Sequence, residues 1–365
     1  AVFTQLIQLI DATPAGADIR GSMYGFADMD VANALITAHD RGVNVKLIVD
    51  DSTYVDGGTG TEFANPSFDA LKAALGTKDT ATSWIVVCDD QFEDNDHVDD
   101  VERGCLATEP PGPAYNHNKF FVFSKVGPFD DGTSYANVVF QTSSNLSDWY
   151  KIESYNDAVT FTDTTVYNGY VAYHEAERAA RYASAGNNHY YRSTPTGSTY
   201  RAYFFPRGDT SYNNPGSDTI VSVLDEVSCS YIGTDGGRHQ TDIRIAVLSF
   251  VKSRVQVANK LAALRAAGCW VDILYAETDS TITSVLSNAG IQHRLCKFNV
   301  APEIDVRPHN KYLLLDGDYN GEITPRVYTG SPNLAGAALR STDNALVRIT
   351  SADYHAKYHE RRSVT

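Results

Sequence analysis

The tripeptide His-Asn-Lys occurs twice in this chain, at residues 117–119 and 309–311. Each copy is followed by a Ser-x-Asn sequence, at residues 143–145 and 331–333. Because side chains alternate along a strand, the His and Lys of one copy point to the same face. Phosphodiester cleavage needs a nucleophile, an acid for the leaving alcohol and donors for the phosphate oxygens. These residue types supply all three without a metal.

A single His-x-Lys is usually an edge histidine beside a solvated lysine, but two copies at matching places of a duplicated fold indicate a shared catalytic site. We therefore expect both histidines and both lysines to be catalytic, and the Ser-x-Asn residues to bind the substrate phosphate. The predicted catalytic residues are His117, Lys119, His309 and Lys311, and the predicted phosphate-binding residues are Ser143, Asn145, Ser331 and Asn333. Neither a metal nor a cofactor is expected.

The chain also repeats at a larger scale, since residues 6–51 and 219–277 show one order of elements. Each segment reads as a helix, a strand, a second helix, a glycine and a buried strand. The two strands and the intervening helix are predicted at 19–26, 31–40 and 45–49 in the first copy and at 243–250, 255–267 and 271–275 in the second. Gly42 and Gly268 are typical of a helix C-cap, and the apolar runs after them suit parallel strands buried on both faces. A further strand is predicted directly after each His motif, at 120–123 and 312–315.

These repeats predict an α/β fold of two similar α/β/α sandwich half-domains related by a pseudo-two-fold, with the active site at their interface. We place the halves at residues 1–185 and 216–365. The segment 186–215, rich in Gly, Asn, Ser, Thr and Tyr, is interpreted as the linker. Because both half-sites lie in one chain, a monomer suffices.

The overall charge limits the partners. The formal net charge is −15, whereas proteins built to bind nucleic acid usually carry a basic face. Nucleic acid is therefore an unfavoured partner, although a local basic groove is not excluded. No run of eighteen apolar residues occurs, so no transmembrane segment is expected.

The cysteines indicate the compartment. Cys88 and Cys105 bracket an acidic segment that a disulfide would close, and one further bridge is expected among Cys229, Cys269 and Cys296. Their spacings match no zinc pattern, so an oxidising, extracellular setting fits best. The acidic run 89–100 lacks the spacing of an EF-hand and is interpreted as a solvated loop. The glycosylation sequon 145–147 falls on a predicted phosphate ligand, which favours secretion from a bacterium.

The motifs resemble the HxKxxxxD and GSxN signatures of the phospholipase D superfamily, and the resemblance covers nearly the whole chain. The second half matches completely, through His309, Lys311, Asp316, Gly330, Ser331 and Asn333. The first half departs twice, with Ser124 in place of the motif Asp and Thr142 in place of the Gly of GSxN. The motif Asp is interpreted as a structural hydrogen-bonding residue, a role that Ser124 can also fill.

The resemblance implies a two-step mechanism, in which one histidine forms a phosphohistidine while the other protonates the leaving alcohol. The family also places a carboxylate about 11 residues past the motif Asn, where it holds the nucleophilic histidine. Asp157 occupies that region in the first half, whereas the second half offers Asn344 beside Asp343. We therefore expect His117 to be the nucleophile and His309 the acid and base, with Asp343 as an alternative partner that would reverse the roles.

The leading hypothesis is a secreted, metal-independent phospholipase D-type hydrolase that acts on phospholipids, with transfer to alcohols as a second reaction. Two alternatives stay open. One is a nuclease of the same superfamily, which would need a contiguous Lys/Arg groove over the motifs. The other is a phosphate-binding protein that has lost catalysis through the altered first motif.

Overall fold

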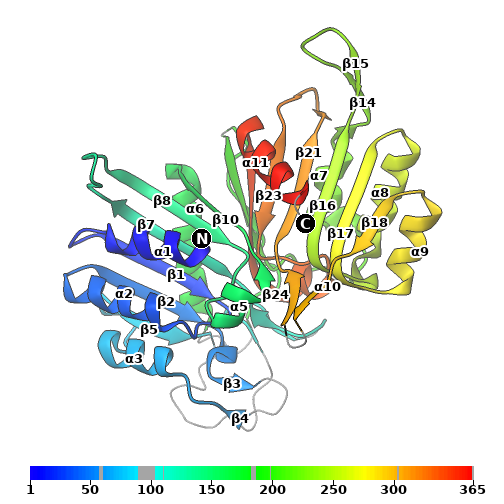
Figure 1. Ribbon diagram of the computed structural model, residues 1–365. Coiled ribbons are helices and arrows are strands. Elements are labelled where there is room, and N and C mark those ends of the chain that lie inside the picture. Colours follow the sequence, from blue (N-terminus) through cyan, green and yellow to red (C-terminus); the bar gives the residue numbers. More distant parts are fainter. Residues whose placement is uncertain are drawn as a thin grey trace.

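A computed structural model describes residues 1–56, 61–88, 103–109, 111–181, 186–197, 199–301 and 304–363. Two mixed β-sheets lie side by side, and helices cover each of them (Figure 1). The predicted acidic loop at 89–100 lies outside the described residues.

The first sheet belongs to the N-terminal half. Its strands, in spatial order, are β10 (Ala158–Thr162), β8 (Tyr135–Thr142), β7 (Lys119–Val126), β1 (Asp18–Met23), β2 (Asn44–Val49) and β5 (Trp84–Val87). Three helices pack on one face through a shared apolar cluster, namely α1 (Val2–Asp11), α2 (Met29–Asp40) and α3 (Pro66–Leu75). The long helix α6 (Thr164–Ala180) packs on the opposite face.

The second sheet repeats this order and extends it. Its strands are β11 (Arg192–Ser193), β12 (Tyr200–Phe205), β24 (Thr342–Thr350), β23 (Arg326–Gly330), β21 (Lys311–Asp316), β16 (Asp242–Phe250), β17 (Trp270–Thr278) and β18 (Gln292–Leu295). The outer face carries α7 (Thr219–Asp225), α8 (Val255–Ala266) and α9 (Ser280–Asn288), and the inner face carries α11 (Ala352–Ser363).

The two strand orders correspond one to one. From β24 to β18 the second sheet repeats β10 to β5 of the first, with the same parallel and antiparallel pairings. The predicted repeat of strands and helices is therefore confirmed, and so is the α/β fold class. The segment 186–215, interpreted as a linker, also supplies β11 and β12 to the second sheet.

The inner faces of both halves share one apolar core. It joins Phe120 and Val122 of β7 to Leu314 of β21 and Val347 of β24, all fully buried. This packing brings the starts of β7 and β21, where the two His motifs lie, to the same interface.

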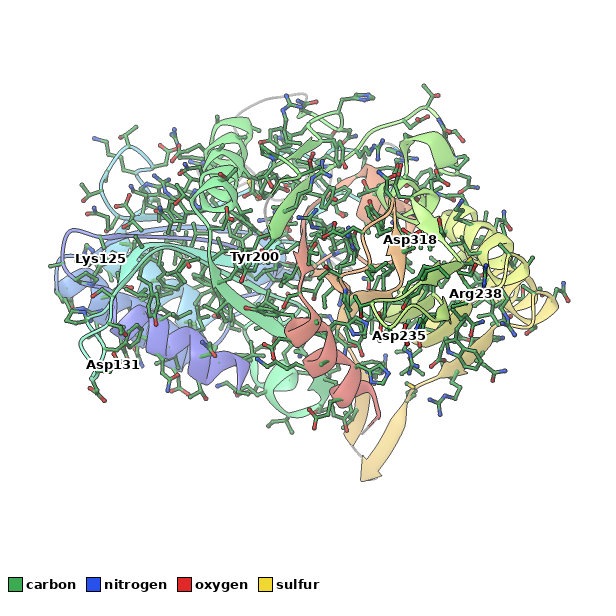
Figure 2. All side chains as sticks on the ribbon, turned by 90° about the horizontal axis from the view of Figure 1, so that it is seen from above. Lys125, Asp131, Tyr200, Asp235, Arg238 and Asp318 are labelled. Atoms are coloured by element: carbon green, nitrogen blue, oxygen red, sulfur yellow. A yellow bond between two sulfur atoms is a disulfide. The ribbon has the colours of Figure 1, made fainter. Side chains whose placement is uncertain are left out.

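The halves differ mainly at their surfaces. The hairpin of β14 (Ser230–Ile232) and β15 (Arg238–Gln240) projects from the second half only (Figure 1). Seen from above, Asp235 and Arg238 of this hairpin lie over the second half, whereas Lys125 of β7 and Asp131 of the β7–β8 connection lie at the far end of the first half (Figure 2). The remaining short elements are β3 (Val55–Asp56), β4 (Thr61–Glu62), β6 (Tyr115–Asn116), α5 (Asp148–Ile152), β9 (Ser154–Tyr155), β13 (Val227–Ser228), β19 (Phe298–Ala301), β20 (Ile304–Pro308), β22 (Asp318–Tyr319), α10 (Gly336–Arg340) and the single 3-10 turns Asp51–Thr53, Pro215–Ser217 and Lys252–Arg254.

Both disulfide predictions are confirmed. Cys88 is bonded to Cys105 and Cys229 to Cys269, while Cys296 is buried outside any disulfide. In the part of the chain that the structure describes, no helix combines the length and apolar character needed to cross a bilayer.

Candidate active site

Each His motif is tied by its backbone to the opposite half. The His117 N–H donates to the Asp343 carbonyl at 2.9 Å, and β6 pairs with the start of β24. In the same way the His309 N–H donates to the Tyr155 carbonyl at 2.9 Å, and β20 pairs with β9. The two motifs are therefore positioned by each other's half-domain.

The histidine side chains also contact the opposite half-domain. Nδ1 of His117 lies 3.0 Å from Oδ1 of Asn344, and Nδ1 of His309 lies 2.9 Å from Oδ1 of Asn156. The amide orientations are fixed because each Nδ2 donates elsewhere, to the Ala338 carbonyl and Thr342 for Asn344 and to the Tyr150 carbonyl and Ser154 for Asn156. Each amide oxygen therefore accepts a hydrogen bond from the Nδ1–H group, which leaves Nε2 of each imidazole for chemistry.

This geometry corrects the expected carboxylate partner. Asp157 does not contact His117: its carboxylate accepts hydrogen bonds from Thr329 and from Tyr358 of the second half, both at 2.5 Å. Asp157 thus links the half-domains. Counting from the motif asparagines shows the reason, since the residues 11 positions after Asn145 and Asn333 are Asn156 and Asn344. A strict count in both halves would have found this amide pair, which the preference for a carboxylate obscured.

Asp343, the alternative partner, has another task. Its carboxylate accepts the backbone N–H groups of Cys105, Leu106 and Ala107 at 2.6, 3.1 and 2.8 Å. Burial raises the pKa of Asp343 to about 7, although these three donors act in the opposite direction. Asp343 therefore fixes the segment after Cys105 against the strand that carries Asn344.

The predicted phosphate-binding serines also contact these asparagines. The Ser143 hydroxyl donates to Oδ1 of Asn156 at 3.1 Å, and the Ser331 hydroxyl donates to Oδ1 of Asn344 at 2.7 Å. The structure thus brings each serine to the partner of a histidine, and its observed hydroxyl contact positions that amide.

The motif lysines form a buried cationic pair. Lys119 is 0% and Lys311 is 3% exposed. Each Nζ donates to the carbonyl of the histidine two residues before it, which leaves two protons on each ammonium. Among the described residues neither lysine forms an ion pair with a carboxylate, and both retain donors suited to phosphate oxygens.

Burial is the main influence on these charges. It lowers the pKa of Lys311 to about 7, while Asp157 and Glu277 act to raise it. Burial also holds the pKa of Lys119 well below its usual value, with a further lowering by Lys311. A bound phosphate would reverse both effects, because an anion stabilises the charged form of a lysine.

The histidines respond to the same surroundings. Burial lowers the pKa of His117 and of His309, and the charges of both lysines lower each of them further. The four groups therefore interact as one site at the interface, as the pseudo-two-fold predicts. An empty site favours neutral imidazoles, and an anion between the lysines would favour the imidazolium that protonates a leaving group.

The predicted phosphate ligands Asn145 and Asn333 are consistent with a bound group. Oδ1 of each is buried and has no hydrogen-bond partner within the described residues. A buried amide oxygen without a partner is costly, so an occupant of the site would relieve both. The middle Asn of the first motif acts differently, because Asn118 donates to the buried carboxylate of Glu177 at 2.8 Å.

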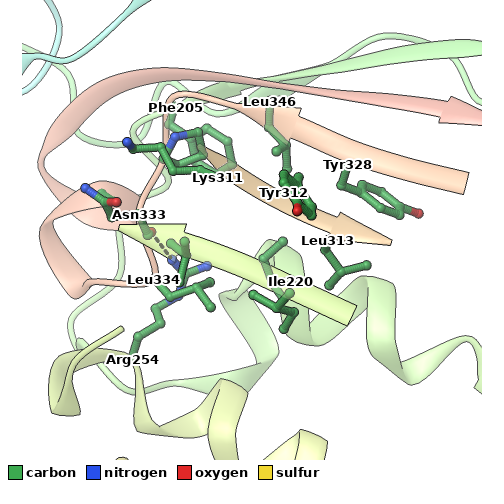
Figure 3. A pocket seen from close by; sticks show the side chains of 14 residues that line it. Phe205, Ile220, Arg254, Lys311, Tyr312, Leu313, Tyr328, Asn333, Leu334 and Leu346 are labelled. Carbon is green, nitrogen blue, oxygen red and sulfur yellow. Dashed lines mark hydrogen bonds between the residues drawn. The ribbon is translucent and has the colours of Figure 1, made fainter. Parts of the chain in front are cut away.

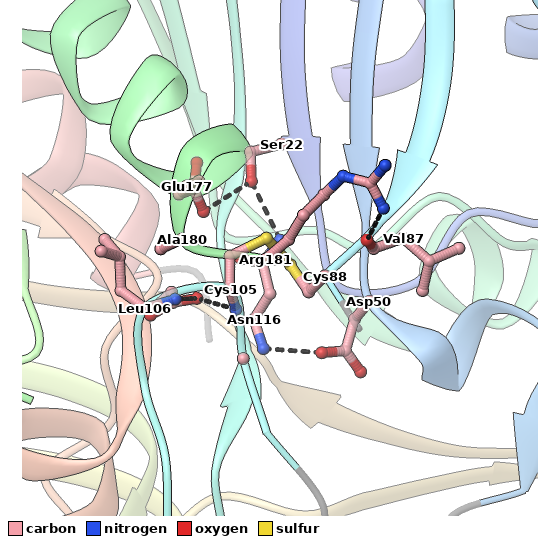
Figure 4. Close-up of a disulfide and its surroundings, with 12 residues drawn as sticks. Ser22, Asp50, Val87, Cys88, Cys105, Leu106, Asn116, Glu177, Ala180 and Arg181 are labelled. Carbon is pink, nitrogen blue, oxygen red and sulfur yellow. Dashed lines mark hydrogen bonds between the residues drawn. A yellow bond between two sulfur atoms is a disulfide. The ribbon is translucent and has the colours of Figure 1, made fainter. Parts of the chain in front are cut away.

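A polar network, missed by the sequence analysis, supports the first motif from behind. Glu177 accepts a hydrogen bond from Ser22, which in turn accepts one from Asn116, and the Asn116 N–H donates to Asp50 (Figure 4). The Cys88–Cys105 disulfide lies beside this network (Figure 4). Its members are scattered along the chain, so only the fold brings them together.

The walls of the site are aromatic on one side and apolar on the other. Tyr24 and Tyr115 pack edge-on against His117, and Tyr150 packs against His309 with ring centroids 4.8 Å apart. Behind Lys311 and Asn333 lies a cavity of about 40 Å³ with mostly apolar walls (Figure 3). These walls exclude water and account for the desolvation of the lysine.

Comparisons with known proteins agree with this arrangement. Residues 6–176 and 238–362 match the family described as cardiolipin synthase, PLD-like domain. The chain belongs to this PLD-like family. The expected phospholipase D-like family is therefore confirmed. No curated protein sequence matches the chain significantly.

Solved structures resemble this PLD-like chain at low sequence identity. Phosphatidylserine synthase from Haemophilus influenzae Rd KW20 aligns with a TM-score of 0.60 and 12% identity over 99% of this chain and 82% of its own. Polyphosphate kinase from Porphyromonas gingivalis aligns with a TM-score of 0.50 and 12% identity over 98% of this chain, which spans only 47% of that kinase chain. At such identities the likeness supports the fold.

Proposed function

We propose that this PLD-like protein is a phosphodiesterase that cleaves the head-group phosphodiester of phospholipids through a phosphohistidine. The observation that carries the proposal is a set of two hydrogen-bonded pairs, His117–Asn344 and His309–Asn156, each joining one half-domain to the other. The two motif lysines are buried in the same site. The amides leave both Nε2 atoms available, and the lysines supply donors where charge develops on phosphorus oxygens.

The reaction proceeds in two displacements. Nε2 of the nucleophilic histidine forms a bond to phosphorus as the bond to the head-group oxygen breaks, and the other imidazolium gives its proton to that oxygen. Water then attacks phosphorus, its proton passes to the second histidine, and the phosphorus–nitrogen bond breaks. An alcohol in place of water gives transfer instead of hydrolysis. The assignment of His117 as nucleophile stays a proposal, now without a carboxylate to support it.

A phospholipid is favoured because the rim beside His309 is apolar. Trp149 is 36%, Ile152 65% and Tyr155 45% exposed, and the Trp149 ring lies 6.4 Å from that of His309. Exposed aromatic and aliphatic side chains suit a lipid interface. Lys151, a basic residue on this rim, forms ion pairs with Asp28, Asp30 and Asp148, so it offers little to a nucleic-acid backbone. The two disulfides support secretion.

An activity panel tests the proposal. Phosphatidylcholine vesicles, bis(p-nitrophenyl) phosphate, single-stranded DNA and duplex DNA are offered to the wild type and to His117→Ala. We expect cleavage of the vesicle lipid and the small diester, lost in the variant, and phosphatidylethanol when ethanol is added. Cleavage of DNA alone would establish the nuclease alternative. Phosphate binding without hydrolysis of any diester would establish the non-catalytic one.

A further inference from the structure

A second cationic site lies outside the interface of the half-domains. A cleft of about 590 Å³ opens beside α7 and is lined by four arginines, namely Arg201, Arg207, Arg326 and Arg348. Its lining contains two carboxylates, Glu226 and Glu322, both on exposed residues. Such a concentration of positive charge is unexpected in a chain of net charge −15. Neither the pseudo-two-fold nor the proposed catalytic chemistry accounts for it.

The arginines are held close together by the sheet. Arg201 of β12 is the direct antiparallel partner of Arg348 of β24, and Arg326 begins the next strand, β23. Like charges directly opposite one another on a sheet are destabilising. Burial lowers the pKa of Arg348, and the charges of Arg326 and Arg201 lower it further. This cluster therefore costs stability unless an anion occupies the cleft.

Aromatic stacking fixes the guanidinium groups. The guanidinium carbon of Arg201 lies 4.9 Å from the Tyr203 ring centroid, that of Arg207 lies 4.6 Å from the Tyr191 ring, and that of Arg326 lies 3.8 Å from the Tyr319 ring. A stacked guanidinium keeps its N–H groups in the plane of its edge, where they can reach a phosphate in pairs. Arg201 also donates to the Thr194 carbonyl at 2.9 Å and to the Ser193 hydroxyl at 3.0 Å, and Arg207 donates to Thr219 at 3.2 Å, so the guanidinium groups are held in fixed orientations.

Ion pairs and hydrogen bonds within the chain occupy only some of the guanidinium donors. Arg326 pairs with Glu322 at 2.9 Å, but the Glu322 side chain is 56% exposed and is largely screened by water. Nε of Arg326, a residue that is 1% exposed, has no hydrogen-bond partner within the described part of the chain. A buried guanidinium N–H without an acceptor is a second, independent observation that favours an anion as ligand.

The cleft is distinct from the candidate active site. Strand β23 runs from Arg326 at the cleft to Gly330 beside Ser331, a span of about 13 Å. Tyr203 and Tyr328 of this region belong to the apolar cluster on the outer face of the sheet, whereas the His motifs lie at the interface between the halves. The two sites therefore share strands but lie at opposite ends of β23.

We propose that this four-arginine cleft binds a phosphate-bearing anion with at least two negative charges. Its volume is in the range of small-molecule sites, and paired guanidinium donors match phosphate oxygens better than carboxylates of the chain can. The same chemistry is offered by a soluble organic phosphate and by the head group of an anionic phospholipid. The proposal does not depend on the proposed catalytic function.

The test measures pyrophosphate binding to the full chain by titration calorimetry. The variant Arg201→Gln/Arg207→Gln removes two partly exposed charges, and Arg192→Gln/Arg238→Gln removes two exposed charges outside the cleft as a matched control. We expect pyrophosphate to bind the wild type and the control, and to bind the cleft variant at least tenfold more weakly. Hydrolysis of bis(p-nitrophenyl) phosphate should be equal in all three proteins, because the cleft is not the catalytic site.

A second arm identifies the source of the phosphate. Sedimentation with phosphatidylcholine vesicles containing phosphatidic acid is measured with and without pyrophosphate. Vesicle binding that pyrophosphate displaces and the cleft variant lacks supports the proposal with a lipid head group as ligand. Pyrophosphate binding without vesicle binding supports it with a soluble phosphate. Equal pyrophosphate binding by the cleft variant and the wild type, or an equal loss in the control, overturns it.

Discussion

The two half-domains carry the same reacting groups, but different residues surround these groups in each half. Both place a His, a Lys, a Ser and an Asn at equivalent positions, and both hold the opposite histidine with an amide. Among the described residues, however, the aromatic rings that pack against the two histidines come from the first half, namely Tyr24, Tyr115, Trp149 and Tyr150. Duplication thus explains the reacting groups, and later divergence explains the shape of the site around them.

The halves also differ in how their backbones approach. A Cβ on Gly330 would lie 2.2 Å from the Ala345 carbonyl oxygen, so the second half requires glycine there. At the equivalent place the first half has Thr142, whose hydroxyl donates to the Asp157 carbonyl at 2.7 Å. Ser124, which replaces the motif Asp, accepts the Asp18 N–H at 2.8 Å and links β7 to β1, as expected for a structural residue. Both departures in the first half therefore have hydrogen-bonding roles.

The largest expected effect comes from removing one histidine at a time, which tests whether the two half-sites are equally needed. His117→Ala and His309→Ala should each lower kcat/KM on a diester by about 10⁴, and the double variant should be little worse, because the two groups act as a unit. Steady-state kinetics on bis(p-nitrophenyl) phosphate measures this. A phosphoenzyme trapped from the wild type should carry its label on a histidine, and label on His309 would reverse the proposed roles.

Removing either disulfide should lower stability, but only removal of the one in the first half should lower activity. Cys88→Ser/Cys105→Ser opens a bridge of sequence separation 17 and should lower the free energy of unfolding by about 3 kcal/mol. It should also lower kcat about tenfold, because the segment after Cys105 holds Asp343 next to Asn344. Cys229→Ser/Cys269→Ser, with separation 40, should cost about 4 kcal/mol and leave kcat unchanged. Urea unfolding and kinetics below the transition check both; equal kcat values would remove the proposed link to Asp343.

The glycine of the second half offers a smaller effect. Gly330→Ala should destabilise the fold by about 1–3 kcal/mol, because its methyl group meets a backbone carbonyl that cannot rotate away. Thr142→Ala in the first half should cost about 1 kcal/mol, the value of a lost hydrogen bond. Thermal unfolding measures the difference, and equal costs would show that the strands relax around residue 330.

The smallest expected effect concerns pH and distinguishes the histidines. Burial and both lysines lower the pKa of His117, and Asn344→Asp would raise it because a carboxylate stabilises the imidazolium. If His117 is the nucleophile, the acid limb of kcat/KM should move up by about one pH unit. Asn156→Asp should instead move the basic limb up, through the acid His309. The opposite pattern of limbs would exchange the two roles, and unfolding temperatures serve as the control.

The sequence by itself determined the repeated order of helices and strands, the paired motifs and the Cys88–Cys105 disulfide, whereas the pairing among Cys229, Cys269 and Cys296 came from the structure. These follow from local patterns, such as apolar periodicity, the glycine after a helix and residue types suited to phosphate, which a chain carries wherever it folds. The matching positions of the motif asparagines also implied matching partners for the two histidines. The predicted partner in the first half, Asp157, was wrong by one residue, because Asn156 makes the contact.

Only the tertiary structure decided which groups touch. The amide of each half reaches the histidine of the other, the segment after Cys105 is anchored on Asp343, and Arg201, Arg326 and Arg348 meet on neighbouring strands. These contacts join residues far apart in the chain, and they depend on how the two half-domains pack across their shared core. The desolvation that shifts the pKa values of the lysines has the same origin, because burial is a property of the assembled interface.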